Sequence, residues 1–376
     1  MFSFLTRKIY ETEPDAFGLD LSDLSFKFAQ LKRTRRGTKL VAFGFGDIPK
    51  GVMVNGEIQN EGEMIKVLAG AFAKPAYGSL TTRHVVCSLP EEHSFTRVVQ
   101  LPLMKKEEAR EAVRWEIEQN IPLSINDVYY DWQFVETGPK IGHQDVLVSA
   151  MPKKFVDGFV STLHTCNLSV KGLEVESVAV SRALVKNLAS GEPLLMVDLG
   201  ATRTSFIIFS GSALQFTSSV PVGGNKMIEV IVQALGVEHQ EAKRLFYEVG
   251  LDAHVDGGKV RTVLEPLVRD LAEQIRNYIS FYEGHALHEH HARSDAAGAQ
   301  GSVAIKKILL CGGVSNLNGL NVYLAMALKI AVETGNPWVN ILTAPLREVP
   351  GLSYRTSLSY TTALGLALSG IQKAPR

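Results

Sequence analysis

The chain carries one strand–turn–strand pattern twice, once near its start and once just past its middle. The first copy runs over residues 17–31 and the second over residues 194–209, with the apolar spacing of buried strands. In each copy an aspartate, Asp20 or Asp198, ends the first strand before a turn. Two copies of one hairpin that open the two halves of a chain predict two similar α/β lobes.

Chain length agrees with that division. At 376 residues the chain is too long for one ordinary domain and fits two lobes. We expect an N-terminal arm over residues 1–15, a first lobe over 16–190 and a second lobe over 191–376. The first lobe would include a small inserted subdomain at about 91–152, and the second a helical subdomain at about 236–302.

Hydrophobic periodicity places the regular elements around these hairpins. It predicts helices at 61–73, 105–120, 155–166, 177–188, 226–235, 240–250, 264–287, 320–330 and 361–372. It predicts further strands at 39–44, 84–89, 95–101, 128–135, 145–150, 214–220 and 305–310. Residues 288–302 are small and polar, and we expect a mobile loop there.

Composition excludes several classes of protein. Lys plus Arg and Asp plus Glu both total 39, so the charge balance calls for neither nucleic acid nor an anionic membrane surface. The longest uncharged stretch, residues 308–328, is interrupted by glycines and asparagines, which excludes a spanning helix. The N-terminus has no secretory signal, and three widely spaced cysteines argue against a disulfide framework. We therefore expect a cytosolic protein.

The turn of the second hairpin has residues suited to binding phosphate. Gly200 and Ala201 lack bulk, so backbone N–H groups can approach a phosphate, and Thr202 and Thr204 can add hydroxyl donors. Asp198 at the strand end can hold the hydration shell of Mg²⁺. A single turn of this kind also ends many ordinary strands, so both interpretations stay open for one copy.

A second glycine motif follows the strand predicted at 305–310. Gly312 and Gly313 would let a flat base or a ribose lie against the backbone, and the helix that follows offers free N–H groups. Alone, the motif would be a tight strand-to-helix turn. Three motifs therefore follow one another along the chain: Asp20, Ser25 and Lys27 in the first hairpin, the turn of the second hairpin, and this pair of glycines. That order is the signature of the actin, Hsp70 and sugar-kinase superfamily.

Within that superfamily the chain resembles the PilM family of type IV pilus assembly proteins from about residue 18 to 370. The resemblance implies an actin-like (RNase H-like), two-lobed α/β fold with an inserted small subdomain. Matching segments are the first phosphate loop at 17–27, the second at 198–204, the turn and helix at 221–229, the adenosine motif at 309–320 and the closing helix at 361–368. Segments 97–103 and 112–122 are similar to the family's small subdomain and discriminate best, because actin and Hsp70 lack it in this form.

The resemblance also implies site residues. ATP would contact Asp20, Ser22, Ser25, Lys27, Gly200, Ala201, Thr202, Thr204, Gly223, Gly224, Gly312 and Gly313, and Mg²⁺ would be held through water by Asp20 and Asp198. Glu176, just before the helix that links the lobes, matches the position where the superfamily often orients the attacking water. A glutamate there also suits the helix dipole.

Two departures from the family pattern bear on the nucleotide. Residues 22–24 replace the usual small residues of the first loop, and Asp23 puts a negative charge near phosphates unless a metal or Lys27 offsets it. Lys243 and Phe246 stand where the family has acidic and lysine residues that face the ribose. We therefore expect altered nucleotide binding and at most a weak ATPase.

The function implied is that of a cytoplasmic adaptor, held peripherally at the inner membrane through its partners. It would bind ATP between its lobes and the cytoplasmic N-terminal tail of a PilN-like membrane protein, at residues 98–122 and the strand near Val148. Other pilus machine components and a ring-like homo-oligomer are further implied contacts.

Several alternatives remain open at this stage. The chain could be a degenerate scaffold of a type II secretion or competence apparatus, or a small-molecule kinase, although no second acidic site serves as a base. A filament former like FtsA would carry a C-terminal amphipathic membrane helix, and residues 371–376 are too short and polar for one. The histidines at 285, 288, 290 and 291 suggest either a metal site or, more often, a solvated loop end.

Overall fold

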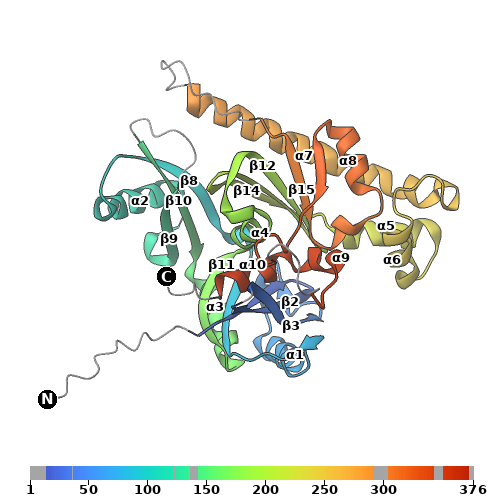
Figure 1. Cartoon of the computed structure of the whole chain (residues 1–376), viewed down its shortest axis with the longest axis horizontal. Helices are drawn as coiled ribbons and strands as arrows, with labels where there is room; N and C mark the ends of the chain where they lie inside the picture. The colour runs from blue at the N-terminus through green and yellow to red at the C-terminus, as the bar shows by residue number, and fades with distance from the viewer. Residues whose placement is uncertain are drawn as a thin grey trace.

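The computed structural model describes residues 14–35, 37–121, 123–135, 143–291, 304–342 and 350–371, without the side chains of 285–291. Most of the predicted arm, Pro122 and the last residues of the chain lie outside these ranges. Two large sheets, one of six strands and one of five, form the frame, and a separate three-stranded sheet lies at one side (Figure 1).

The first large sheet has the strand order β11-β7-β1-β2-β3-β6. Its strands are β1 (Phe17–Ser22), β2 (Ser25–Thr34), β3 (Gly37–Asp47), β6 (Tyr77–Gly78), β7 (His84–Leu89) and β11 (Ser169–Val175). β2 is antiparallel to both β1 and β3, whereas β7 runs parallel to β1 and β11 runs parallel to β7. α1 (Glu61–Ala73) and α3 (Lys153–Thr165) cover the outer face, beside the short hairpin of β4 (Met53–Val54) and β5 (Glu57–Ile58).

The second large sheet repeats that order as β14-β13-β12-β15-β16. Its strands are β12 (Ser190–Leu199), β13 (Thr204–Gly211), β14 (Ala213–Val220), β15 (Lys307–Cys311) and β16 (Ala331–Thr334), with the same parallel and antiparallel pairs. Its outer face packs against α5 (Gly224–Leu235), α6 (His239–Glu248), α7 (Lys259–His291) and α8 (Leu320–Leu328). The repeated hairpin seen in the sequence therefore opens two sheets of one topology.

Two helices lie between the large sheets. α4 (Glu176–Leu184) packs on the inner face of the second sheet, and α10 (Thr361–Ser369) packs on the first. The two helices cross at Gly365, where an added Cβ would lie 1.9 Å from Ala179 O. Only a glycine lets the backbones approach this closely, so this crossing fixes where the two halves meet.

The three-stranded sheet belongs to a small unit inserted after β7. Its order is β8-β10-β9, from β8 (Phe95–Pro102), β9 (Val128–Val135) and β10 (His143–Pro152), and α2 (Lys106–Asn120) covers one face. The other face divides between the two lobes. Met151 joins the core of the first sheet, whereas Leu147 joins a core with Met196, Phe209 and Leu214 of the second sheet.

The observed elements depart from the predicted ones at a few ends. α7 begins at Lys259 rather than residue 264 and continues through His291, so the loop predicted from residue 288 is wrong over 288–291. α4 ends at Leu184, before residue 188. β16 and the short α9 (Tyr354–Ser357) were not predicted.

Two predictions of absence concern only the residues that the structure describes. Across those ranges, no helix combines the length and the apolar composition needed to cross a bilayer. Within the same ranges no group of three metal-binding side chains gathers, and the side chains of His285 to His291 lie outside the description. Cys87, Cys166 and Cys311 are free thiols, as predicted.

Candidate functional site

The two aspartates singled out in the sequence occupy equivalent places in the two sheets. Asp20 on β1 faces Lys27 across the hairpin, and the Ser88 hydroxyl donates to Asp20 Oδ1 at 3.1 Å. Asp198 on β12 lies beside Cys311 of β15, and the Cys311 thiol donates a hydrogen bond to the Asp198 carboxyl group. Burial raises the pKa of both aspartates, to about 6 for Asp198. Each aspartate therefore sits where its charged form is costly, unless a cation comes near.

A third and a fourth carboxyl group join these aspartates. Glu176, the first residue of α4, has a pKa well above its usual range because of burial and the nearby charges of Asp20 and Asp198. Glu91 is buried and accepts a hydrogen bond from the Ser177 backbone N–H at 3.2 Å, and burial raises its pKa as well. Asp20, Asp198 and Glu91 therefore lie close enough to Glu176 for their charges to raise its pKa, and nothing in the local sequence of Glu91 marks it for this role.

The tips of the two hairpins are built differently. In the first, the Ser22 hydroxyl donates to Ser25 O at 2.8 Å, so these serines close the turn on themselves. In the second, Gly200 N–H donates to Arg203 O at 2.9 Å. The Thr204 hydroxyl donates to Val222 O at 2.7 Å. This bond uses the hydrogen that was expected to be available to a phosphate.

Glycines bring two segments against the second hairpin. Gly224 N–H, at the start of α5, donates to Gly200 O at 3.0 Å. A Cβ added to Gly223 would lie 2.6 Å from Ala201 O. Gly312 has φ +80°, and a Cβ there would lie 2.4 Å from Asp198 Oδ1. The predicted glycines therefore pack α5 and the end of β15 against the Asp198 turn.

Arg203 connects the two hairpins directly. Its guanidinium lies 3.3 Å from Asp23 Oδ2 in the turn of the first hairpin and also pairs with Glu92, just before β8. The other oxygen of Asp23 accepts the Gly56 backbone N–H at 2.8 Å. Asp23 was expected to need Lys27 or a metal for compensation, and Arg203 supplies it instead. Sequence analysis missed this partner because 180 residues separate the two.

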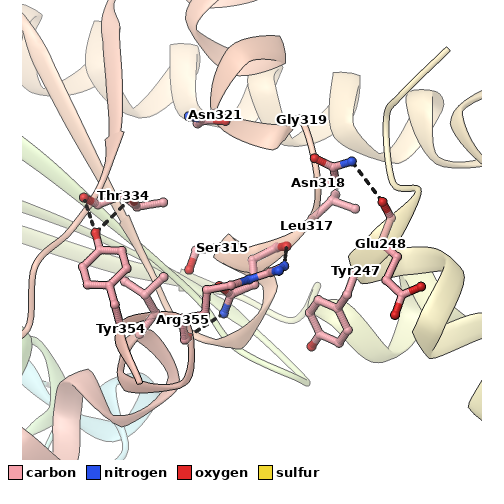
Figure 2. A pocket seen from close by; sticks show the side chains of 12 residues that line it. Tyr247, Glu248, Ser315, Leu317, Asn318, Gly319, Asn321, Thr334, Tyr354 and Arg355 are labelled. Carbon is pink, nitrogen blue, oxygen red and sulfur yellow. Dashed lines mark hydrogen bonds between the residues drawn. The ribbon is translucent and has the colours of Figure 1, made fainter. Parts of the chain in front are cut away.

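A polar pocket of about 520 Å³ opens beside Gly312 and Gly313 (Figure 2). The turn after β15 lines one side, and Tyr247 and Glu248 at the end of α6 line another. Arg355 lies on α9, and its Nη2 donates to Asn316 O at 3.2 Å. The volume suits a small organic ligand, and the lining offers amide, hydroxyl and guanidinium groups.

The residues that face this pocket from α6 are not those expected. Phe246 is fully buried in the second-lobe core, and Lys243 is not among the lining residues. One residue further along, Tyr247 turns toward the pocket, and burial raises its pKa while Arg355 opposes that shift. The two positions that match the family's ribose-facing residues therefore do not line this pocket.

Solved structures with this arrangement define the class of protein. The PilM-PilN type IV pilus biogenesis complex contains a chain with 23% identity, covering 96% of this chain and 99% of that one, at a TM-score of 0.74. EutJ from Carboxydothermus hydrogenoformans has 14% identity over 97% and 93%, at 0.53. MreB 5 of Spiroplasma citri, solved with AMPPNP, has 11% identity over 95% and 96%, at 0.52. The chain is an actin-like, two-lobed protein.

A family model narrows this class. The family described as type IV pilus assembly protein PilM matches residues 18–371, and the chain belongs to that family. Among curated proteins, the cell division protein FtsA of Neisseria meningitidis serogroup B is 23% identical over 54% of this chain and 49% of its own length. A protein-glutamate methylesterase of Vibrio parahaemolyticus is 31% identical over 29% of the chain and 31% of its own length. The chain thus spans about half or less of the curated relatives it matches.

Proposed function

We propose that this PilM-family protein is a nucleotide-dependent adaptor that binds ATP with Mg²⁺ between its lobes. The observation that carries the proposal is the turn after β15: Gly312 at its start lies against the carboxyl group of Asp198, and residues 315–319 further along it line the polar pocket. A nucleotide has two ends that match these features. Its phosphates carry a metal that carboxyl groups can hold, and its flat base can enter a polar pocket. MreB 5, which shares the fold, was solved with AMPPNP and with ADP.

The residues present fit such a ligand. Bound Mg²⁺ would supply the positive charge that the triphosphate and the cleft carboxylates both require. Asp20 and Asp198 would hold its hydration shell, because two carboxyl groups with raised pKa values regain their charged forms beside a cation. Lys27, Thr202 and the N–H groups of residues 201 and 202 would bind phosphate oxygens. Gly312 and Gly313 would carry the ribose and base toward Tyr247.

The proposal does not include hydrolysis of ATP, and we assign no residue as its general base. Glu176 was the residue predicted to orient water. Its pKa lies well above the usual range, so the neutral form is favoured and little of the group is present as the carboxylate that would accept a proton from water. The proposed role of the nucleotide is therefore to bias how the two lobes sit, which needs contacts to both lobes and no bond cleavage.

The partner proposed is the cytoplasmic N-terminal tail of a PilN-like membrane protein, bound at the small unit. In the segments predicted to meet it, Val148 is buried in the core of the small unit and Val98 is half-buried against the second sheet. Trp115 on α2 is 64% exposed, and Leu103 and Leu123 are exposed beside it in sequence. An apolar peptide could use these side chains as anchors, because aromatic residues dominate such contacts. This tail would hold the protein at the inner membrane.

The nucleotide proposal is tested by equilibrium binding of ATP with Mg²⁺ to three proteins. We expect the native chain to bind, Asp198→Ala to lose binding at least tenfold, and Asp270→Ala, an exposed position on α7, to bind like the native chain. If the native chain does not bind, the altered first loop has abolished the site. The protein is then a degenerate scaffold that works through its partner surface.

The partner proposal is tested with a synthetic PilN-type tail peptide. We expect Trp115→Ala to weaken binding by about 2 kcal/mol, the effect of a central aromatic contact. Met326→Ala removes an even more exposed apolar side chain on α8, at 77%, and serves as the matched control. Equal affinity of both variants would place the tail elsewhere.

A further inference from the structure

Arg203 stands at a junction of three parts of the molecule. It belongs to the turn between β12 and β13, and its guanidinium pairs with Asp23 and with Glu92. The three side chains are 17%, 16% and 26% exposed respectively. We call them the Arg203 cluster. Ion pairs that are this well shielded are screened less by water and salt than surface pairs.

Both acidic partners are fixed by their own parts of the fold. The Gly56 backbone N–H holds Asp23 from the β4–β5 hairpin at 2.8 Å. Glu92 lies in the single turn that leads into β8, next to Glu91, which is bonded to the start of α4. The cluster therefore ties the second lobe to the tip of the first hairpin and to the entry of the small unit.

The same guanidinium belongs to the turn that we propose binds phosphate. Arg203 O accepts the Gly200 N–H at 2.9 Å, so the two residues lie in one tight turn. Arginine pairs with phosphate in the same forked geometry that it uses with carboxylates. One side chain cannot bind both sets of partners fully at once.

We propose that the Arg203 cluster is an exchangeable interlobe latch, closed on Asp23 and Glu92 without nucleotide and opened when the terminal phosphate of a nucleoside triphosphate takes over Arg203. Its phosphate arm rests on the proposed function, whereas its latch arm does not. Opening frees the hairpin tip and the entry to β8 together, so the occupancy of the cleft is passed to the small unit.

The latch arm is tested without nucleotide, by hydrogen–deuterium exchange on the full chain. Asp23→Asn keeps the shape and the acceptor for Gly56 but removes the charge, and Arg203→Gln removes the cation. We expect both variants to exchange at least fivefold faster in segments 91–96 and 200–205. Lys306→Gln, which breaks an exposed ion pair with Glu192, is the control and leaves these segments unchanged. Unchanged exchange in both cluster variants overturns the latch.

The phosphate arm is tested by binding of ATP and ADP with Mg²⁺ to the same proteins. Removing the competitor in Asp23→Asn should tighten ATP binding about fivefold or more, and Arg203→Gln should weaken it by a similar factor. ADP, which lacks the third phosphate, should respond less. Shifts in the same direction for both variants overturn the exchange of partners. If no protein binds ATP, the phosphate arm is wrong while the exchange experiment still decides the latch.

Discussion

The two large sheets share five strands in the same order, yet their inner faces carry side chains of opposite size. Two residues before each aspartate stand Gly18 in the first sheet and Met196 in the second. Their cross-strand partners are Ala29 and Ile207. The first sheet thus presents a small pair and the second a large pair at the same place.

This difference follows what lies on each face. α10 rests directly on the first sheet, and a Cβ at Gly18 would lie 2.2 Å from Ala363 O. On the second sheet, Met196 and Ile207 reach α4 and also Leu147 of the small unit. The repeat preserves the strand order and the acid, whereas the packing is fitted separately in each lobe.

The acids themselves have unequal neighbours. Across its hairpin, Asp20 faces Lys27, whereas Asp198 faces Ser205. On the parallel side, Asp20 has a serine hydroxyl and Asp198 has a cysteine thiol. The first acid is thus the better compensated within its own sheet, and the second depends more on a cation from outside.

The largest effect is expected from filling the small position. Gly18→Ala should destabilise the protein by about 3 kcal/mol or more, because backbone atoms of α10 block the added carbon. Chemical unfolding measures the change. Gly158→Ala on α3, where a Cβ meets nothing within 4 Å, should instead stabilise by about 0.5–1 kcal/mol. Equal stability of the two variants would mean that α10 does not lie this close to β1.

Much of this frame could be predicted from the sequence. Alternation located both hairpins, and the positions of Asp20 and Asp198 in them were right. The start of α7 was predicted too late because Pro266 reads as a first-turn residue. The apolar face of Val260, Leu264 and Val268 continues the helix through it, and burial outweighs the lost backbone hydrogen bond.

An intermediate effect is expected at the less compensated acid. The pKa of Asp198 rises from 3.8 to about 6 on folding, so the unfolded chain ionises first and stability falls as pH rises between these values. Asp198→Asn should therefore stabilise the nucleotide-free protein by about 2 kcal/mol at pH 7, with no gain below pH 4. Thermal unfolding across pH checks this, with Asp270→Asn as a control that shifts little. A uniform gain at all pH values would point to packing instead.

The smallest expected effect is a shift in the pKa of Asp198 when its hydrogen-bond donor is made like that of Asp20. Cys311→Ser gives Asp198 the kind of hydroxyl that Ser88 gives Asp20. A hydroxyl is a stronger donor than a thiol, so the pKa of Asp198 should fall, by about half a unit. Titration of its carboxyl resonance by NMR measures the shift, and Cys166→Ser, on a half-buried thiol away from the acids, should leave it unchanged. A rise in the pKa would contradict the comparison.

The site was less predictable than the frame. Motif order identified the residues that gather around Asp198, because each lies within its own short segment. The contacts of Arg203, Glu91 and Tyr247 form between segments that are far apart in the chain. The spacing of residues within one segment does not show which distant segment it will meet. The charge of Asp23 was the one visible sign, since a buried carboxylate requires a partner from somewhere.

The small unit has one further consequence for how the protein can move. The backbone attaches it to the first lobe at both ends, before β8 and after β10. One face of β10 reaches into both lobes, because Leu147 joins the core of the second sheet and Met151, four residues further along the strand, joins the core of the first. Any rotation of the lobes against each other must therefore separate one of these contacts or bend β10, so this single strand couples the small unit to the angle between the lobes.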